Sequence, residues 1–171
     1  MRVVSFLLIS LLAGLAPAVL FNGSFSIFDD YSGSALTVGT TGPLKGLVEV
    51  RPNTIDPWLI ETIPGIDSTT GTTAIIRHAA TNLYLGFRNI ESGETAIFTD
   101  EYPAIVQFEP RGNLRFRAEL PTSNSLYLRW VVEKFSTLDN RLVLRLRTSS
   151  AKPEGRTYFT VLGTPNATLH E

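Results

Sequence analysis

The chain has 171 residues, of which 43% are hydrophobic and 18% charged, and its formal net charge is −1. This composition is typical of a folded domain, and a charge near zero provides no general attraction for nucleic acid or an anionic membrane. The chain has no cysteine and two histidines, which excludes thiol nucleophiles, disulfide frameworks, thiolate metal sites and sites that need three histidines.

Residues 1–18 have the features of a secretory signal peptide. Arg2 precedes a long apolar run, and Ala16 and Ala18 occupy the −3 and −1 positions of a cleavage site after Ala18. An uncleaved anchor is the alternative, because the run approaches the ~20 residues that span a bilayer, but a glycine and a proline near its end favour cleavage. We therefore expect residues 19–171 to form one secreted, extracellular domain that makes no membrane contact after cleavage.

Two N-glycosylation sequons stand near the two ends of the mature chain. They are Asn22-Gly23-Ser24 and Asn166-Ala167-Thr168. Together with the leader, they predict a secreted glycoprotein with glycans on Asn22 and Asn166. A secreted domain without disulfides must obtain its stability from its core, and a chain of this length can bury one.

The rest of the chain alternates short apolar runs with turn residues and contains no long apolar pattern with a 3.6-residue period. This pattern predicts an all-β domain. In chain order, the expected strands are Phe25–Phe28, Val48–Val50, Trp58–Ile60, Ala74–Ile76, Ala96–Phe98, Leu114–Phe116 and Arg141–Arg147. In the last of these, leucines alternate with arginines, which predicts one buried face and one solvated face.

Three segments share one pattern, in which a leucine is followed two residues later by a branched or aromatic apolar residue. They are Ala35-Leu36-Thr37-Val38, Tyr84-Leu85-Gly86-Phe87 and Tyr127-Leu128-Arg129-Trp130. Later aromatic residues, Trp58, Phe108 and Phe159, follow at spacings of 50 and 51 residues. The pattern predicts three units of four strands, at about residues 24–71, 72–112 and 113–162. A β-sandwich, which also has short strands and regular turns, is the alternative.

Three four-stranded units of this size resemble the β-trefoil fold. The segments Ser24–Ile27, Ser32-Gly33, Ala35–Val38 and Pro57–Ile60 are similar to one repeat of the ricin B-type lectins. The resemblance covers about residues 24–162, but only the hydrophobic skeleton. The Gln-x-Trp motif of those lectins is not retained, because Asp56, Val106 and Thr157 stand two residues before the late aromatics. β-Trefoil protease inhibitors share the same skeleton.

The resemblance implies a non-catalytic, lectin-like module that binds glycans or glycoproteins. Sugar recognition needs a carboxylate or amide that accepts hydrogen bonds from hydroxyl groups, and an aromatic face for the C–H side of the ring. Asp29, Asp30 and Tyr31 follow the first strand, and Asn53 lies five residues before Trp58. The resemblance carries the carbohydrate-binding role to these four residues, although an ordinary turn is the alternative interpretation of the first three.

A protease inhibitor is the second functional hypothesis. The segment Gly42–Gly46 has the composition of an exposed loop in which Pro43 restricts the backbone, and it offers Lys45 to a trypsin-like pocket. Arg88, in the matching loop of the second unit, is the second candidate. The partner would then be an extracellular protease.

The sequence favours no enzyme. Only His78 and His170 could act as the base of a catalytic triad, and no Gly-x-Ser-x-Gly motif accompanies either of them. We expect His78 to be solvated, and Trp58 and Trp130 to belong to the core. We also expect a monomer with no cofactor, no metal and no nucleic-acid partner.

The third unit is basic, with eight Lys or Arg against three acids between residues 111 and 150. This excess predicts either a patch for an anionic glycan, because guanidinium groups match carboxylates and sulfates, or a charged sheet surface compensated by the first two units. The second interpretation is the simpler one.

Overall fold

The computed structural model of the protein describes residues 20–63, 71–111, 115–122, 127–148, 157–163 and 168–170. The expected signal peptide, Asn166 of the second sequon and Leu114 of the sixth expected strand lie outside these residues. In the part of the chain that is described, no helix is long and apolar enough to cross a membrane.

The prediction of an all-β protein is confirmed. The strands are β1 (Leu20–Asn22), β2 (Ser24–Asp29), β3 (Ser34–Val38), β4 (Val48–Arg51), β5 (Trp58–Thr62), β6 (Thr72–His78), β7 (Tyr84–Gly86), β8 (Ile97–Thr99), β9 (Val106–Pro110), β10 (Arg115–Pro121), β11 (Tyr127–Lys134), β12 (Leu142–Thr148), β13 (Tyr158–Gly163) and β14 (Thr168–His170). One short 3₁₀ helix, η1 (Gly42–Leu44), precedes β4. Each strand expected from the sequence overlaps one of these strands.

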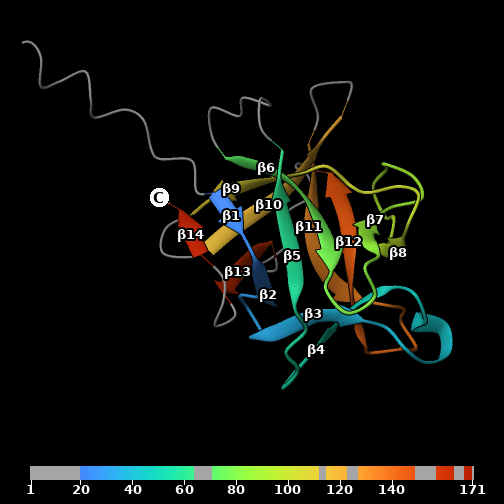
Figure 1. Cartoon of the computed structure of the whole chain (residues 1–171). Coiled ribbons are helices and arrows are strands. Elements are labelled where there is room, and N and C mark those ends of the chain that lie inside the picture. The colour runs from blue at the N-terminus through green and yellow to red at the C-terminus, as the bar shows by residue number, and fades with distance from the viewer. Residues whose placement is uncertain are drawn as a thin grey trace, which may run out of the picture.

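Nine strands close into a barrel (Figure 1). The pairing runs from β11 through β12, β4, β3, β2, β5, β6 and β9 to β10, and β10 then pairs with β11. Every pair in this order is antiparallel. Because successive side chains of a strand point to opposite faces, such a barrel turns alternate residues toward one interior and toward solvent.

β13 adds a second closure, because it pairs with β2 on one side and with β10 on the other. The strands β2, β5, β6, β9, β10 and β13 therefore form a ring of six. Three strand pairs, β3 with β4, β7 with β8, and β11 with β12, extend from this ring. Along the chain, the order of ring strand, hairpin and ring strand occurs three times.

β1 and β14 form a separate two-stranded ribbon. In its register, Asn22 pairs with Thr168. Asn22 is the acceptor of the first sequon, and Thr168 is the hydroxyl residue of the second. The fold therefore brings Asn22 beside the last residue of the second sequon, whereas Asn166 lies outside the described residues.

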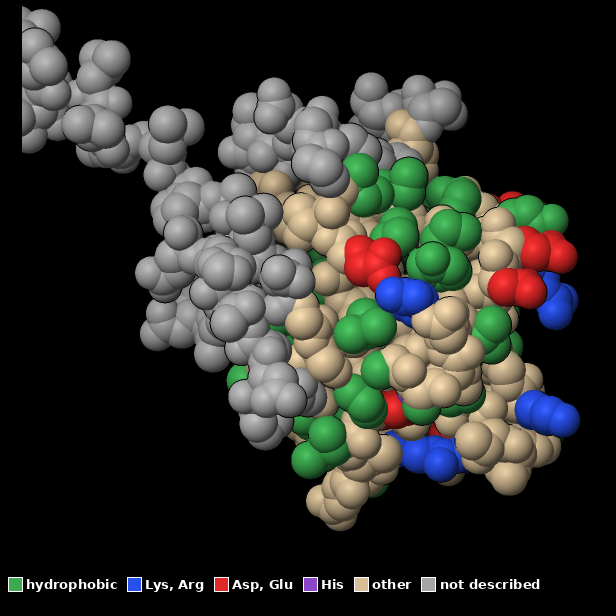
Figure 2. Space-filling view, in the orientation of Figure 1, with side chains coloured by type: hydrophobic (Ala, Val, Ile, Leu, Met, Phe, Trp, Pro, Cys, Tyr) green, Lys and Arg blue, Asp and Glu red, His purple; other side chains and the backbone are tan. Residues whose placement is uncertain are grey.

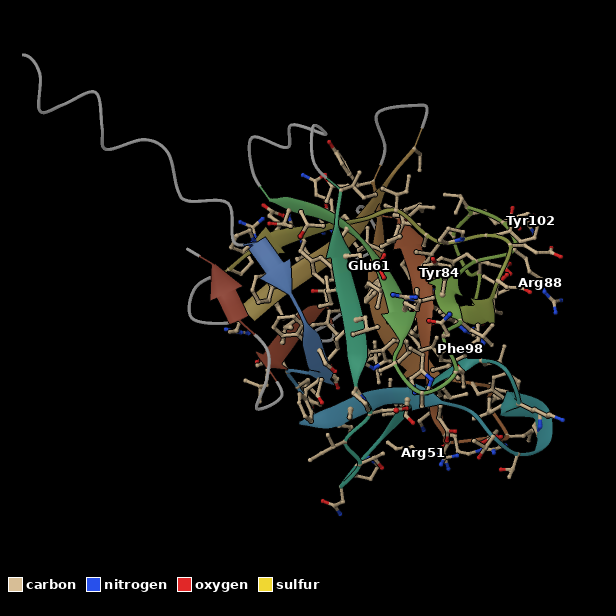
Figure 3. The ribbon with its side chains drawn as sticks, viewed as in Figure 1. Arg51, Glu61, Tyr84, Arg88, Phe98 and Tyr102 are labelled. Atoms are coloured by element: carbon tan, nitrogen blue, oxygen red, sulfur yellow. The ribbon has the colours of Figure 1, made fainter. Side chains whose placement is uncertain are left out.

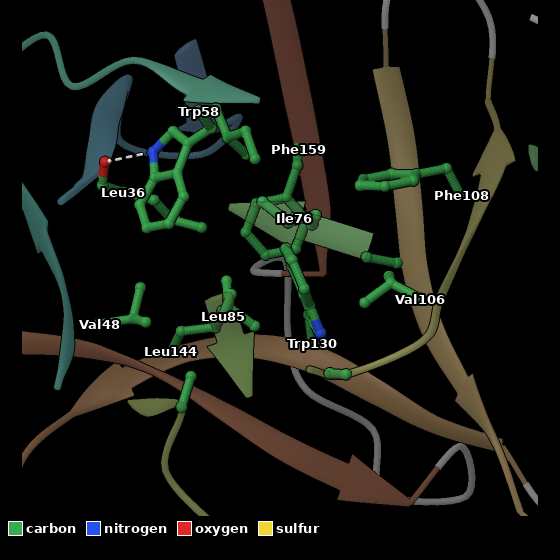
Figure 4. Packing of buried hydrophobic residues seen from close by; sticks show 14 of the residues in the cluster. Leu36, Val48, Trp58, Ile76, Leu85, Val106, Phe108, Trp130, Leu144 and Phe159 are labelled. Atoms are coloured by element: carbon green, nitrogen blue, oxygen red, sulfur yellow. Dashed lines mark hydrogen bonds between the residues drawn. The ribbon is translucent and has the colours of Figure 1, made fainter. Parts of the chain in front are cut away.

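The interior is filled by the residues that carry the repeated pattern (Figure 4). The buried members are Leu36, Leu85, Phe87, Leu128, Trp130, Trp58, Phe108 and Phe159. The indole Nε1 of Trp58 donates a hydrogen bond to the carbonyl of Leu36 at 3.1 Å, which satisfies its polar atom inside the core. Because burial of one large apolar side chain contributes about 1.5–3 kcal/mol, these residues supply a large share of the stability of a chain that has no disulfide.

The alternation predicted for the last long strand is found in β12 from Leu144 to Arg147, where Leu144 and Leu146 are buried and Arg145 and Arg147 are partly exposed on the other face. Val143 departs from this prediction, because it lies on the face of the arginines and is fully buried. The face that was expected to be solvated is therefore only partly exposed.

Candidate functional site

Asp29 fixes the turn that follows β2. Its Oδ2 atom accepts hydrogen bonds from the hydroxyl of Ser32 at 2.6 Å and from the backbone N–H of Ser32 at 3.2 Å. Gly33, at a φ of 65°, donates its N–H to the carbonyl of Asp29 at 2.8 Å. Asp29 lies two residues after the buried Ile27, so strand alternation turns its side chain inward, where it is fully buried. Asp29 therefore holds the turn and does not present its carboxylate to solvent.

Asp30 points to the outer face of β10 and β13. Its Oδ1 accepts a hydrogen bond from the hydroxyl of Thr160 at 3.0 Å, and its Oδ2 forms an ion pair with Arg115 at 2.7 Å. Its backbone N–H donates to the carbonyl of Tyr158 at 3.0 Å. The guanidinium of Arg115 lies over the ring of Tyr158, 4.9 Å from the ring centroid. Three residues of the third unit thus hold the Asp30 carboxylate in one orientation.

Tyr31 and Asn53 lie at the same end of the sheet formed by β2, β3 and β4. Tyr31 is 67% exposed. Asn53 is also exposed, and its φ of 53° places it in the left-handed region that asparagine tolerates in turns. The first residues of β3 pair with the last residues of both β2 and β4. The turns at 30–33 and 52–54 therefore lie at the same end of the sheet. Arg51 marks this end of β4 in Figure 3.

The structure therefore gathers Asp30, Tyr31 and Asn53 at one end of the β2–β3–β4 sheet and turns Asp29 away from them. It adds Arg115, Tyr158 and Thr160, which the sequence did not assign to this surface. Thr160 and Asp30 are 130 residues apart, and their contact depends on the register of β13 beside β2. No local pattern in either strand shows that register.

The second unit repeats the turn of Asp29 with different chemistry. His78 is buried at the end of β6, and its Nδ1 contacts the hydroxyl of Thr81 at 2.9 Å and accepts the N–H of Thr81 at 3.3 Å. The N–H of Asn82, at a φ of 61°, donates to the carbonyl of His78 at 2.9 Å. The expectation that His78 is solvated is therefore wrong. Its position two residues after the buried Ile76 turns the ring inward, as it does for Asp29.

Asp56 connects this turn to the first unit. Its Oδ1 lies 2.6 Å from the Nε2 of His78, and its Oδ2 accepts hydrogen bonds from the hydroxyl of Thr37 at 2.7 Å and the N–H of Val38 at 3.2 Å. Because the N–H of Thr81 points at Nδ1, the proton of the neutral ring is assigned to Nε2, which donates to Asp56. Asp56 stands two residues before Trp58, the place of the glutamine in the Gln-x-Trp motif of ricin B-type lectins. In this structure its hydrogen bonds connect β3 with β6.

Lys45 is exposed at the end of a loop with a defined conformation. Its N–H donates to the carbonyl of Gly42 at 3.1 Å, and the N–H of Gly46 donates to the carbonyl of Gly39 at 2.9 Å. Leu44 anchors the loop by full burial, and a Cβ atom on Gly39 would lie 2.0 Å from its carbonyl oxygen, so only glycine fits there. These contacts make the loop rigid. The backbone N–H groups of Lys45 and Gly46 are already donated to carbonyl groups of the loop itself.

Arg88, the other candidate for an inhibitor loop, is exposed after β7. In Figure 3 its side chain points outward near Tyr102, on the opposite side of the molecule from the β1–β14 ribbon.

The basic residues of the third unit are largely paired. Seven arginines have acidic or carbonyl partners: Arg111 with Glu109, Arg115 with Asp30, Arg117 with Glu109 and Glu119, Arg129 with Glu119, Arg141 with Asp139, Arg147 with Glu133, and Arg145 with the carbonyl of Phe135. Most of the partners belong to the third unit itself, and Asp30 and Glu109 come from the first and second. The pairing therefore supports the interpretation of a charged sheet surface whose positive charges are compensated. The compensating acids come from the third unit as well as from the first two.

The same pairing of charges occurs between the first and second units, where Arg77 of β6 lies 2.5 Å from Glu61 of β5. In the view of Figure 2, an acidic and a basic side chain lie side by side within a mainly hydrophobic area over these strands. The charges in this part of the surface are therefore paired.

The fold and the surface around Asp30 define the protein as an all-β barrel protein with a polar and aromatic surface at one end of its first hairpin. No protein-family model and no curated protein matches the chain. Among the residues that the structure describes, no group of three or more His, Cys, Asp or Glu side chains could hold a metal ion.

Proposed function

We propose that the protein is a carbohydrate-binding, lectin-like module of the β-trefoil type that acts without catalysis. The β-trefoil assignment is supported by the ring of six strands and by the threefold order of ring strand, hairpin and ring strand. The leader and the sequons support secretion as a glycoprotein, and we propose that it is a monomer whose partners are glycans or glycoproteins.

One observation carries the proposed site. The carboxylate of Asp30 is oriented by Arg115 and Thr160, and the next residue in the same turn, Tyr31, exposes two thirds of its surface. A sugar needs an oriented acceptor for its hydroxyl groups and an aromatic face for its C–H groups, and this turn supplies one residue of each kind. Because three fixed contacts hold Asp30, little conformational entropy would be lost when a ligand binds.

The charges of this surface favour a neutral sugar. Asp30 and Arg115 cancel each other, and each carboxylate oxygen keeps a lone pair beyond its present partner. A pair of neighbouring hydroxyl groups can donate to Asp30 and accept from Arg115, whose side chain is 47% exposed. Asn53, at the edge of the same surface, adds an amide that can both donate and accept.

The test is a glycan-array screen of the chain from residue 19 onward, with Tyr31→Ala and Asp30→Asn beside it. Removing an aromatic platform should weaken binding about tenfold, and removing the charged acceptor should weaken it by at least as much. Tyr102→Ala is the matched control, since Tyr102 is 61% exposed at a different place. Asp29→Ala is unsuitable, because it would disturb the turn itself. Equal loss in the Tyr102 variant, or no binding by the unaltered chain, would refute this site.

A protease inhibitor is the second proposal, and the rigid loop around Lys45 favours it. Leu44 is fully buried, and four backbone hydrogen bonds join residues within the loop, so the exposed Lys45 is held in place. We rank it second because the N–H of Lys45 is already used by Gly42, whereas inhibitors that bind like substrates use that group to pair with the protease. Lys45→Ala should abolish trypsin inhibition while Lys134→Ala leaves it unchanged, and Arg88→Ala tests the other candidate.

A further inference from the structure

Two arginines stand opposite each other on the outer face where β9 and β10 pair. The N–H of Arg111 donates to the carbonyl of Arg115 at 2.8 Å, which continues the register that pairs Pro110 with Phe116. Phe108 and Phe116 are buried, so strand alternation turns Arg111 and Arg115 to the solvent side. Like charges at directly opposed positions of neighbouring strands repel each other. An anion bound between these two side chains would offset that repulsion.

Both guanidinium groups keep unused hydrogen-bond donors. Arg115 contacts Asp30 through one nitrogen, and Arg111 contacts Glu109 through one nitrogen. A guanidinium has five N–H donors, and no other acceptor bonds either group among the residues that the structure describes. The side chain of Arg111 is 38% exposed and that of Arg115 is 47% exposed. A ligand in solution can therefore reach the remaining donors.

The acidic partner of Arg111 is shared with a second arginine. One carboxylate oxygen of Glu109 contacts Arg111, and the other contacts Arg117. Arg117 also contacts Glu119, at an oxygen atom that Arg129 contacts as well. Because one negative charge on Glu109 serves two guanidinium groups, part of the charge of Arg111 is left uncompensated. The exposed end of this row of arginines therefore favours an anionic ligand.

The arginine pair adjoins the carbohydrate surface around Asp30. Arg115 belongs to both, because it forms an ion pair with Asp30 at 2.7 Å and also stands opposite Arg111. On its other side, Arg115 pairs with Thr160, which donates its hydroxyl to Asp30. Neighbouring strands lie about 4.8 Å apart, so the row from Thr160 through Arg115 to Arg111 extends roughly 10 Å across three strands. A ligand that contacts both ends of this row is longer than one sugar ring.

We propose that the ligand is an acidic glycan whose sulfate or carboxylate group binds between Arg111 and Arg115. A neighbouring neutral sugar of the same glycan lies on the surface around Asp30. The planar guanidinium groups present N–H donors in pairs, which match the oxygen atoms of either acidic group. The acidic site rests on the proposed function, since Arg115 is common to the two sites and the Asp30 surface suits rings that carry hydroxyl groups.

The experiment compares oligosaccharides that share one neutral backbone and differ by one acidic group. Each neutral oligosaccharide is measured beside a sulfated counterpart and beside a counterpart with a uronic acid, so the two kinds of acidic group are tested separately. Biolayer interferometry measures binding to the chain from residue 19 onward. We expect an acidic counterpart to bind about tenfold more tightly than the neutral oligosaccharide at low salt. This preference should fall as the ionic strength rises, because exposed charges are screened.

The decisive variant is Arg111→Gln. It should abolish the preference for acidic glycans and leave the affinity for the neutral oligosaccharide unchanged, because Arg111 makes no contact with Asp30. Glu109 keeps its contact with Arg117 in this variant, so we expect an unchanged urea midpoint. Arg88→Gln is the matched control, since it removes one exposed positive charge after β7 and should keep the preference.

Equal binding of neutral and acidic oligosaccharides by the unaltered chain would overturn the acidic site and leave the proposed function standing. A preference that persists in Arg111→Gln, or that Arg88→Gln also loses, would overturn it too. Binding of polyglutamate as tight as that of the acidic glycans, and lost in Arg111→Gln, would assign the pair to acidic proteins instead.

Two further outcomes separate the acidic site from the neutral one. Absence of binding by every oligosaccharide would overturn both the acidic site and the proposed function. A preference that depends on Arg111 but survives Tyr31→Ala and Asp30→Asn would support the acidic site and refute the neutral site alone.

Discussion

The turns at residues 29–33 and 78–82 lie 49 residues apart and have one backbone design. In each, the residue that ends the first ring strand is buried, its side chain contacts the residue three positions later, and its carbonyl accepts the N–H of a residue at positive φ. In the first turn the positive-φ residue is Gly33, and in the second it is Asn82, the two residue types that enter this region most easily.

The two turns differ in what the buried side chain reaches. Asp29 contacts Ser32 within its own turn, and its Oδ1 has no protein partner among the described residues. His78 uses both ring nitrogens and extends through Asp56 to the strand that follows the first turn. Asp29 therefore stabilises only its own turn, whereas the equivalent His78 also connects two units. We therefore expect substitution of His78 to destabilise the protein more than substitution of Asp29.

The largest effect is expected for His78→Ala. The substitution removes a buried ring that contacts Trp58 and Phe98, at centroid distances of 5.3 and 5.7 Å, and leaves Asp56 without its closest partner. We expect the free energy of unfolding to fall by about 3–4 kcal/mol, measured by urea denaturation. Arg77→Ala, one residue earlier and partly exposed, should cost less than about 1 kcal/mol. A loss below about 1 kcal/mol for His78→Ala would show that the contact between units is not a main source of stability.

A smaller effect is expected for Asp29→Ala. The side chain is buried, but its hydrogen bonds go only to Ser32, whose N–H lies at the exposed turn and can be hydrated in the variant. The free energy of unfolding should fall by about 1–2 kcal/mol in the same assay. Ser32→Ala should account for about half of that loss, because it removes one of the two hydrogen bonds. If Asp29→Ala costs as much as His78→Ala, the proposed difference between the turns is wrong.

The sequence contained the information that separates Asp29 from Asp30. Ile27 and Ile76 lie in expected strands and are buried, and a period of two residues turns Asp29 and His78 inward with them while Asp30 points elsewhere. The predictions that Asp29 binds sugar and that His78 is solvated rest on residue type and turn composition, and they leave this alternation out. The leucines of the shared pattern and the late aromatics, by contrast, stand at nearly equal spacings that predict equivalent positions, and the structure buries all of them in one core.

The partners of the proposed surface could not be predicted in this way. Arg115 and Thr160 reach Asp30 because β10 and β13 pair in one register, and a register is set by the whole barrel rather than by local residues. The same is true of the arginine pairs. The composition of the third unit shows an excess of positive charge, but only cross-strand neighbours show that Glu109 and Glu119 compensate it.

The smallest loss of unfolding free energy is expected for a surface ion pair, Glu133 and Arg147. It provides a reference for the losses expected at the two turns. Arg147 donates two hydrogen bonds to Glu133, at 2.8 and 2.6 Å, and this hydrogen bonding lowers the pKa of the Glu133 carboxyl below its ordinary value of 4.5. Because both side chains are about one third exposed, solvent screens the pair, and Glu133→Gln should lower the free energy of unfolding by about 0.5 kcal/mol at pH 7.

The pH dependence of this small loss has a definite sign. A carboxyl whose pKa is lower in the folded state stabilises the fold at pH values above its unfolded pKa, and loses that contribution as the pH falls through the folded pKa. The difference in unfolding free energy between the unaltered chain and Glu133→Gln should therefore be constant above about pH 5.5 and shrink as the pH falls below 4.5. Urea denaturation from pH 7 to pH 3 measures it, with Lys134→Gln as a control next to the pair. A difference that grows toward low pH would mean that Glu133 is stabilised in its protonated form, contrary to its contacts with Arg147.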